Sequence, residues 1–202
     1  MAGKKAKEIV EKPQRYIFID TETTGLDPAI HDVIEVAALV MEEDENNVPR
    51  ELARYNGRWG ITNGIVDIEA LAVNGRRATD DVFSTNDHEY RKDLINGFAD
   101  FLATYVTDST FIVGGNIGFD LDFIEALFSK YGMVAVRILS KRKAIDIQHI
   151  AKFLHDAAVI QVPNFKMETL VRYILGKETW THTAMQDVLD SSLLYFTMRE
   201  MV

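Results

Sequence analysis

Two carboxylates stand two residues apart where an apolar segment of this chain ends, in Asp20-Thr21-Glu22. The preceding residues, Tyr16 to Ile19, have the composition of a buried strand. Side chains alternate along a strand with a period of two, so Asp20 and Glu22 are predicted to point to one face. Like charges held that close repel each other and need a partner to stay ionised. A divalent cation is such a partner, so the pair predicts part of a metal site.

Two further carboxylates stand at the boundaries of predicted elements. Asp120 follows a short apolar segment and is predicted to lie where a helix begins, a position that favours anions. The alternative is an N-cap, for which Asp122 is the better candidate. Asp187 follows His182 by five residues, so the two can converge only if His182 precedes the last helix and Asp187 lies in its first turns. The alternative is an exposed histidine and a solvated aspartate.

The four carboxylates together predict more than each does alone. Carboxylate and water ligands suit Mg²⁺ or Mn²⁺. Four acidic ligands could hold two such ions about 3.5–4 Å apart, the arrangement used for in-line displacement at phosphorus. Histidine is the side chain best suited to take a proton from water near neutral pH. The set therefore favours metal-assisted hydrolysis of a phosphate ester, with two ions in the site.

The elements that must position these residues form a mixed α/β pattern. Three strands come first, and the short polar turn between the second and third predicts an antiparallel start. Short strands then alternate with amphipathic helices, which predicts a mixed sheet flanked by helices. The predicted strands are Arg15–Asp20, Val33–Met41, Leu52–Ile61, Phe111–Val113 and Lys143–Ile147, with 42–50 as a turn. The predicted helices are Asp67–Val73, Tyr90–Tyr105, Asp122–Tyr131, Gln148–His155, Lys166–Leu175 and Thr183–Met198.

The composition limits the class of protein. The chain has 202 residues, of which 47% are hydrophobic, and this predicts one globular domain over 15–202 behind a flexible polar tail over 1–14. The net charge of −9 argues against a broad nucleic-acid-binding face, although bound cations reverse the local field. There is no cysteine, which excludes disulfides and thiolate chemistry. Neither a secretory signal nor a membrane span is evident, so a soluble, cytoplasmic protein without membrane partners is expected.

Three segments resemble the motifs of one known family. Phe18–Leu26 (FIDTETTGL) resembles the first motif of the DnaQ-like 3′–5′ exonucleases, and Asn116–Asp120 (NIGFD) resembles the second. His182–Asp187 (HTAMQD) resembles the third in the His-x4-Asp form of the DEDDh branch. The resemblance covers about Arg15 to Tyr195. It implies a ribonuclease H-like fold, in which a five-stranded mixed sheet carries helices on both faces.

The resemblance also implies roles for individual residues. Asp20, Glu22, Asp120 and Asp187 would bind two Mg²⁺ or Mn²⁺ ions, and His182 would be the general base. The residues implied to contact the substrate are Thr23, Leu26, Val73, Asn74, Asn116 and Phe119. For Leu26, Val73 and Phe119 the alternative is core packing.

The chain departs from the family pattern at two places. Gly115 stands where relatives often have histidine before the asparagine of the second motif, and Arg76-Arg77 follow the segment that contacts the terminal nucleotide. These arginines and the cluster Lys141–Lys143 are candidate phosphate contacts. The alternative for both is a solvated surface.

The implied reaction is hydrolysis of the 3′-terminal phosphodiester of a nucleic acid, with DNA favoured, which releases nucleoside 5′-monophosphates. The partner would be a 3′ end, either a single strand or a frayed duplex end. An exoribonuclease that acts on RNA tails or short oligoribonucleotides is the main alternative. A non-catalytic nucleic-acid-binding module and a polymerase-associated proofreading subunit are further ones. A homodimer or a polymerase partner stays open.

Overall fold

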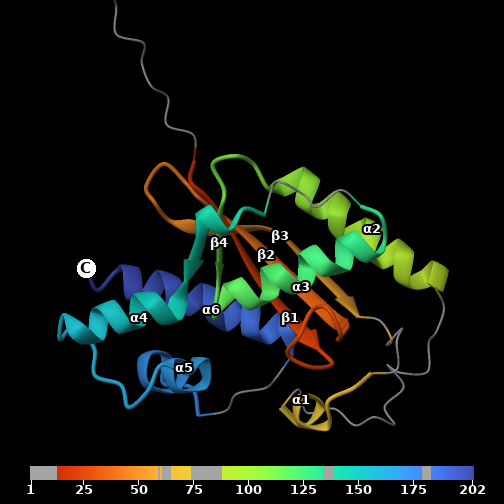
Figure 1. The fold of residues 1–202 in the computed structure, drawn as a ribbon. Coiled ribbons are helices and arrows are strands. Elements are labelled where there is room, and N and C mark those ends of the chain that lie inside the picture. Colours follow the sequence, from red (N-terminus) through yellow and green to blue (C-terminus); the bar gives the residue numbers. More distant parts are fainter. Residues whose placement is uncertain (1–12, 59, 61–64, 74–87, 134–138, 179–182) are drawn as a thin grey trace, which may run out of the picture.

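Five strands form one mixed sheet at the centre of the molecule (Figure 1). The computed structural model describes residues 13–58, 60, 65–73, 88–133, 139–178 and 183–202. The strands are β1 (Arg15–Thr23), β2 (Val33–Glu43), β3 (Pro49–Arg58), β4 (Phe111–Gly114) and β5 (Ala144–Asp146). Their order is β3-β2-β1-β4-β5; β1 is antiparallel to β2, as is β2 to β3, and β4 is parallel to both β1 and β5. The predicted five-stranded mixed sheet with an antiparallel start is confirmed.

The helices divide between the two faces of this sheet. They are α1 (Ile68–Val73), α2 (His88–Tyr105), α3 (Ile117–Lys130), α4 (Ile147–Asp156), α5 (Met167–Leu175) and α6 (Ala184–Arg199), and a short 3₁₀ turn, η2 (Lys141–Lys143), precedes β5. Helices α2 and α3 pack on one face, and α4, α5 and α6 pack on the other (Figure 1).

Alternation along β1 explains why both faces are apolar. Ile17 and Ile19 are buried against α2 and α3, whereas Tyr16 and Phe18 are buried against α4, α5 and α6. Strand β2 alternates in the same way and is buried along almost its whole length. A central strand covered by helices on both sides has to be apolar on both sides. A polar residue at the end of β1 is therefore directed to one helical layer or the other by its position alone.

Several boundaries differ from the predicted ones. Strand β3 begins at Pro49, inside the predicted turn, because an edge strand tolerates proline where no ladder hydrogen bond is needed. Helix α3 begins at Ile117, well before Asp122, since Asn116 takes a left-handed conformation (φ 54°) and lets the chain turn at once from β4 into the helix. Asp122 is therefore not an N-cap; it lies inside α3 and pairs with Lys141.

The described helices include none that is both long enough and apolar enough to cross a membrane. The predicted tail falls almost wholly outside the described residues. The division into a tail over 1–14 and one domain over 15–202 stays a prediction.

Candidate active site

Three carboxylates from two distant parts of the sequence meet at the end of β1. Asp20, Glu22 and Asp187 each offer one oxygen, and these oxygens all lie within 4.8 Å of one another. Asp20 is half-buried, whereas Glu22 and Asp187 are only 6% and 9% exposed. Three acidic oxygens at this separation make a compact set of hard ligands.

Helix α6 brings Asp187 to the strand. Thr183 is its N-cap, and the threonine side chain accepts a hydrogen bond from the Gln186 amide. Asp187 therefore lies in the first turn, where the partial positive charge of the helix N-terminus favours an anion. The helix packs through Ala184 and Val188 against the face of β1 that carries Phe18. By the alternation along β1, Asp20 and Glu22 belong to this same face.

The fourth carboxylate reaches the site from the other helical layer. Asp120 lies in the first turn of α3, is 3% exposed, and is not the helix N-cap. Its Oδ1 accepts hydrogen bonds from the Thr21 amide (2.8 Å) and the Thr21 hydroxyl (2.7 Å). It does not belong to the group of three within 4.8 Å, but its charge acts on the Asp20 carboxyl. The structure thus holds Asp120 next to the cluster, with one oxygen engaged by Thr21.

Burial and mutual repulsion make this cluster costly to ionise. Burial, followed by the charges of Asp120 and Glu22, raises the pKa of Asp20 well above its ordinary value. Burial raises the pKa of Asp120 to about 7, although the two Thr21 hydrogen bonds act in the opposite direction. Burial, then the charges of Glu22 and Asp190, raise the pKa of Asp187 to about 8. In the described ranges, no lysine or arginine forms an ion pair with Asp20, Asp120 or Asp187.

A divalent cation fits these residues. The donor set consists of carboxylate oxygens, the ligands that Mg²⁺ and Mn²⁺ prefer. Asp187 Oδ1 is buried and accepts no hydrogen bond from any described residue, which is rare for a buried oxygen and is explained if a cation is its partner. A bound cation would also lower the pKa values that burial raises.

Four of the predicted substrate contacts lie among the residues whose side chains are described. Leu26 is 77% exposed at the tip of the turn after β1, so core packing is excluded for this residue. Thr23 is buried, and its hydroxyl donates to the Gly25 carbonyl (2.7 Å), which fixes the turn. Asn116 is exposed at the start of α3, and Phe119 is half-buried against Phe123.

Several predicted residues have no described side chain. Val73 is the last residue of α1, and nothing is described of its side chain. Asn74 and His182 lie outside the described residues, as do Arg76 and Arg77.

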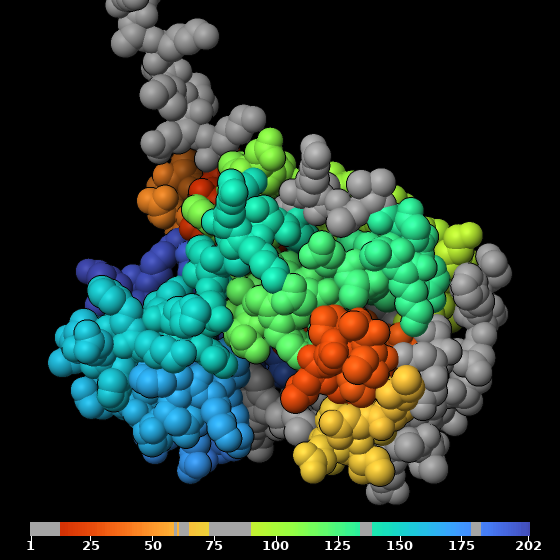
Figure 2. Space-filling model, viewed as in Figure 1, coloured from red at the N-terminus to blue at the C-terminus, as the bar shows by residue number. Residues whose placement is uncertain are grey.

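The turn after β1 and helix α1 lie together on the surface. The Asp67 amide, which directly precedes α1, donates to the Thr24 carbonyl (2.7 Å). Figure 2 shows the turn, in red-orange, beside α1, in yellow. The exposed Leu26 and Ile68 are therefore carried by two segments that a hydrogen bond joins.

Sequence reasoning overlooked Thr21 and the reason for Gly115. The only available signal for Thr21 was its place between two carboxylates, which says nothing of a partner a hundred residues away along the chain. A Cβ at position 115 would lie 2.5 Å from the Met167 side chain, so a larger residue fits there only if Met167 moves. In the cluster before β5, Lys141 pairs with Asp122 and Lys143 donates to the Asp108 carbonyl; a phosphate contact there stays a prediction.

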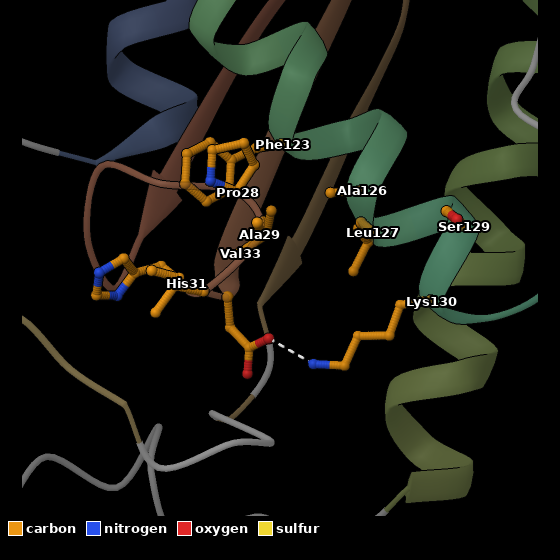
Figure 3. A pocket seen from close by; sticks show the side chains of 11 residues that line it. Pro28, Ala29, His31, Val33, Phe123, Ala126, Leu127, Ser129 and Lys130 are labelled. Carbon is orange, nitrogen blue, oxygen red and sulfur yellow. Dashed lines mark hydrogen bonds and ion pairs between the residues drawn. The ribbon is translucent and has the colours of Figure 1, made fainter.

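A cavity beside helix α3 is separate from the carboxylates. It measures about 360 Å³ and lies between residues 28–33 and helix α3. Figure 3 shows Pro28, His31 and Phe123 around it, with Lys130 reaching Asp32 at its edge (2.7 Å). None of the four carboxylates lines it.

Known proteins resemble this chain in sequence. The model of the RNase_T family, described as an exonuclease, matches residues 17–195. The PolC-type DNA polymerase III of Pediococcus pentosaceus is 26% identical over 161 residues, which cover 80% of this chain and 10% of the polymerase. The DNA polymerase III subunit epsilon of Rickettsia felis is 26% identical over 170 residues, which cover 80% of this chain and 67% of the subunit. The chain spans about a tenth of the length of the PolC-type relatives that it matches.

Solved structures share the fold. Escherichia coli exonuclease I in complex with a dT13 oligonucleotide superimposes with a TM-score of 0.70 at 16% identity, covering 92% of this chain and 40% of that one. The zinc-bound form of its complex with single-stranded DNA gives a TM-score of 0.71 at 16% identity, over 94% and 41% of the two chains. At this identity the likeness concerns the fold.

Proposed function

This chain belongs to the RNase_T exonuclease family, and on that premise we propose that it is a metal-dependent 3′–5′ exonuclease acting on DNA. The observation that carries the proposal is the meeting of Asp20, Glu22 and Asp187, whose oxygens lie within 4.8 Å of one another without a described lysine or arginine partner for Asp20 or Asp187. The products would be nucleoside 5′-monophosphates.

We propose that Asp20, Glu22, Asp120 and Asp187 hold two Mg²⁺ or Mn²⁺ ions. Ions bound there would acidify the attacking water and stabilise the charge that develops on the phosphate and on the departing 3′ oxygen. The carboxylates would contribute by fixing where the charge develops, because β1, α3 and α6 hold them in place. Their burial would keep competing water away from the reacting phosphate.

His182 is proposed as the general base. It directly precedes Thr183, the N-cap of α6, and Asp187 lies in the first turn of the same helix. This is the arrangement in which a histidine and an aspartate five residues apart can serve one site. The imidazole would take the proton of the attacking water, a role suited to its ordinary pKa near neutral pH.

The turn after β1 is proposed to hold the 3′ end. Leu26 would contact the terminal base with its exposed side chain. Thr23 would contribute through the backbone of the turn, which its hydroxyl fixes. Val73, Asn74, Asn116 and Phe119 would complete the contacts. An aliphatic surface supports any base, so little sequence preference is expected.

The names of the relatives support DNA as the substrate and a polymerase as a partner. Two of them are named as DNA polymerase III proteins, and the exonuclease I structures contain oligodeoxynucleotides. A proofreading role beside a polymerase in the cytoplasm is therefore the second candidate function. An exoribonuclease is the alternative, and digestion of DNA and RNA side by side distinguishes the two.

The test is digestion of 5′-labelled single- and double-stranded DNA and of single-stranded RNA with Mg²⁺ or Mn²⁺. Attack from the 3′ end produces a ladder of shortening labelled products, and DNA should be degraded faster than RNA. The Asp20→Ala and Asp187→Ala variants should leave every substrate intact. Immediate release of a labelled mononucleotide, or full activity in either variant, would contradict the proposal.

A further inference from the structure

We propose that Thr21 is a positioning residue that sets how Asp120 faces the metal site. The inference rests on the proposed function, since it concerns the same carboxylates. Thr21 occupies the position between Asp20 and Glu22. It acts through Asp120 rather than on the substrate.

The contact has two donors and one acceptor atom. The amide and the hydroxyl of Thr21 both donate to Asp120 Oδ1, at 2.8 and 2.7 Å. Thr21 is 7% exposed and Asp120 is 3% exposed, so water competes little for either bond. Hydrogen bonds to an ionised acceptor are about twice as strong as neutral ones. Two of them on one oxygen fix the carboxylate against rotation about its terminal torsion, which is otherwise broad.

The alternation of β1 explains why this residue can reach Asp120. Asp20 and Glu22 share the face of the strand that α6 covers, so Thr21 points to the opposite face, which α3 covers. Asp120 lies in the first turn of α3. One strand therefore presents two carboxylates to one helical layer and a hydroxyl to the other, and the hydroxyl draws the carboxylate of α3 to the strand end.

The consequence is that Asp120 is prepared for one ligand geometry. With Oδ1 engaged by Thr21, the position of Oδ2 is determined by the strand and not by a freely rotating side chain. Groups that orient metal ligands through hydrogen bonds contribute about 10- to 100-fold to metal affinity or activity. The backbone amide remains in any variant, so loss of the hydroxyl should give the lower part of that range.

The test compares the binding of Mn²⁺, measured by titration calorimetry without nucleic acid, in three variants. Thr21→Val removes the hydroxyl and keeps the shape, Thr21→Ser keeps the hydroxyl and removes a methyl group, and Asp120→Asn weakens the ligand itself. Thr21→Val should bind Mn²⁺ about tenfold more weakly than the unchanged protein, in the direction of Asp120→Asn. Thr21→Ser should bind within about twofold of the unchanged protein, because the bond is retained.

A second readout separates positioning from a general structural effect. At saturating Mn²⁺ the Thr21→Val variant should regain most of its digestion rate, with an unchanged KM for a DNA oligonucleotide. Thr21→Ala, which also lacks the hydroxyl, replaces Thr21→Val if circular dichroism shows that the valine variant does not fold.

The outcomes distinguish this inference from the proposed function. Equal Mn²⁺ affinity in Thr21→Val and the unchanged protein, or equally weak binding by Thr21→Ser and Thr21→Val, would overturn the inference and leave the proposed function intact. No Mn²⁺ binding by the unchanged protein would overturn both.

Discussion

Buried carboxylates lie near both ends of the strands β1 and β2, but they differ in whether a basic side chain pairs with them. At one end, Glu42 pairs with Arg15 (2.6 Å) and Arg50 (3.1 Å), and Glu43 pairs with Arg199 and accepts a hydrogen bond from the Tyr16 hydroxyl (3.1 Å). At the other end, Glu35 on β2 pairs with Arg58 (3.0 Å), but Asp20 and Asp187 have no lysine or arginine partner among the described residues.

The pKa values follow this difference. The hydrogen bond from Arg15 is the main reason that the pKa of Glu42 is lowered. Burial and neighbouring carboxylates instead raise the pKa of Asp20, Asp120 and Asp187. Carboxylates thus support the fold where arginines pair with them, as at Glu42, and oppose it where they are buried without such a partner, as at Asp120 and Asp187. Binding of an external cation would therefore stabilise the protein most at Asp20, Asp120 and Asp187.

The largest expected effect is loss of activity when a carboxylate of this cluster is replaced. Asp20→Asn keeps the shape of the side chain and removes a charge that metal binding requires. Loss of several kcal/mol of metal-assisted stabilisation corresponds to a digestion rate reduced on the order of 100-fold or more. Initial rates on labelled single-stranded DNA measure it. Glu51→Gln, a change at an exposed acid that pairs with Arg54, is the control and should keep the full rate.

The same carboxylates should make the stability of the metal-free protein depend on pH. The pKa of Asp187 is raised to about 8 and that of Asp120 to about 7, from an ordinary value of 3.8. Between these limits the folded protein binds more protons than the unfolded chain, so stability falls as the pH rises from about 4 to about 8. Thermal unfolding in EDTA across this range measures the fall, and added Mg²⁺ should reverse it.

Asp187→Asn should flatten that pH dependence. The amide carries no charge to bury, so the variant should be more stable than the unchanged protein in EDTA at pH 8, by about 2 to 4 kcal/mol. It should at the same time digest no DNA. A variant that is less stable than the unchanged protein at pH 8 would contradict the contrast between the two ends.

At the end with Glu42 and Glu43, removal of an arginine partner should lower the stability of the protein. Arg199→Met leaves the buried carboxylate of Glu43 without its arginine and should cost about 1 to 3 kcal/mol of unfolding free energy. The rate on DNA should change little below the unfolding temperature. Arg54→Met breaks an exposed pair on β3 and is the matched control, with an expected cost below about 0.5 kcal/mol. Equal losses in the two variants would remove the distinction between buried and exposed pairs.

The smallest expected effect concerns a pair close to the cluster. Lys177 pairs with Asp190, a buried carboxylate on α6 that also accepts a hydrogen bond from Gln186 (3.1 Å). Lys177→Met should cost about 1 kcal/mol of unfolding free energy, because Asp190 keeps its hydrogen bond from Gln186. Urea unfolding measures it. Arg172→Met, which removes an exposed partner of Glu178 at 3.7 Å, should be neutral.

Local pattern was sufficient for much of the architecture. The apolar runs predicted all five strands, and the motif resemblance to DnaQ-like exonucleases agrees with the family match over residues 17–195. The ends of elements were less predictable. The start of α3 depended on a left-handed backbone at Asn116, which residue types alone do not reveal, and Pro49 was taken as a breaker because its edge position was unknown.

The sequence by itself determined that Asp20 and Glu22 share one face of a strand, because alternation is a local property of the backbone. It also determined the family, since the order of the motifs can be read from the sequence alone. Only the tertiary structure decided that Asp187 meets that pair within 4.8 Å, that Thr21 holds Asp120, and that described arginines pair with Glu42 and not with Asp20. These facts depend on helices from distant parts of the chain packing on opposite faces of one strand, and no local pattern encodes which side chains then come into contact.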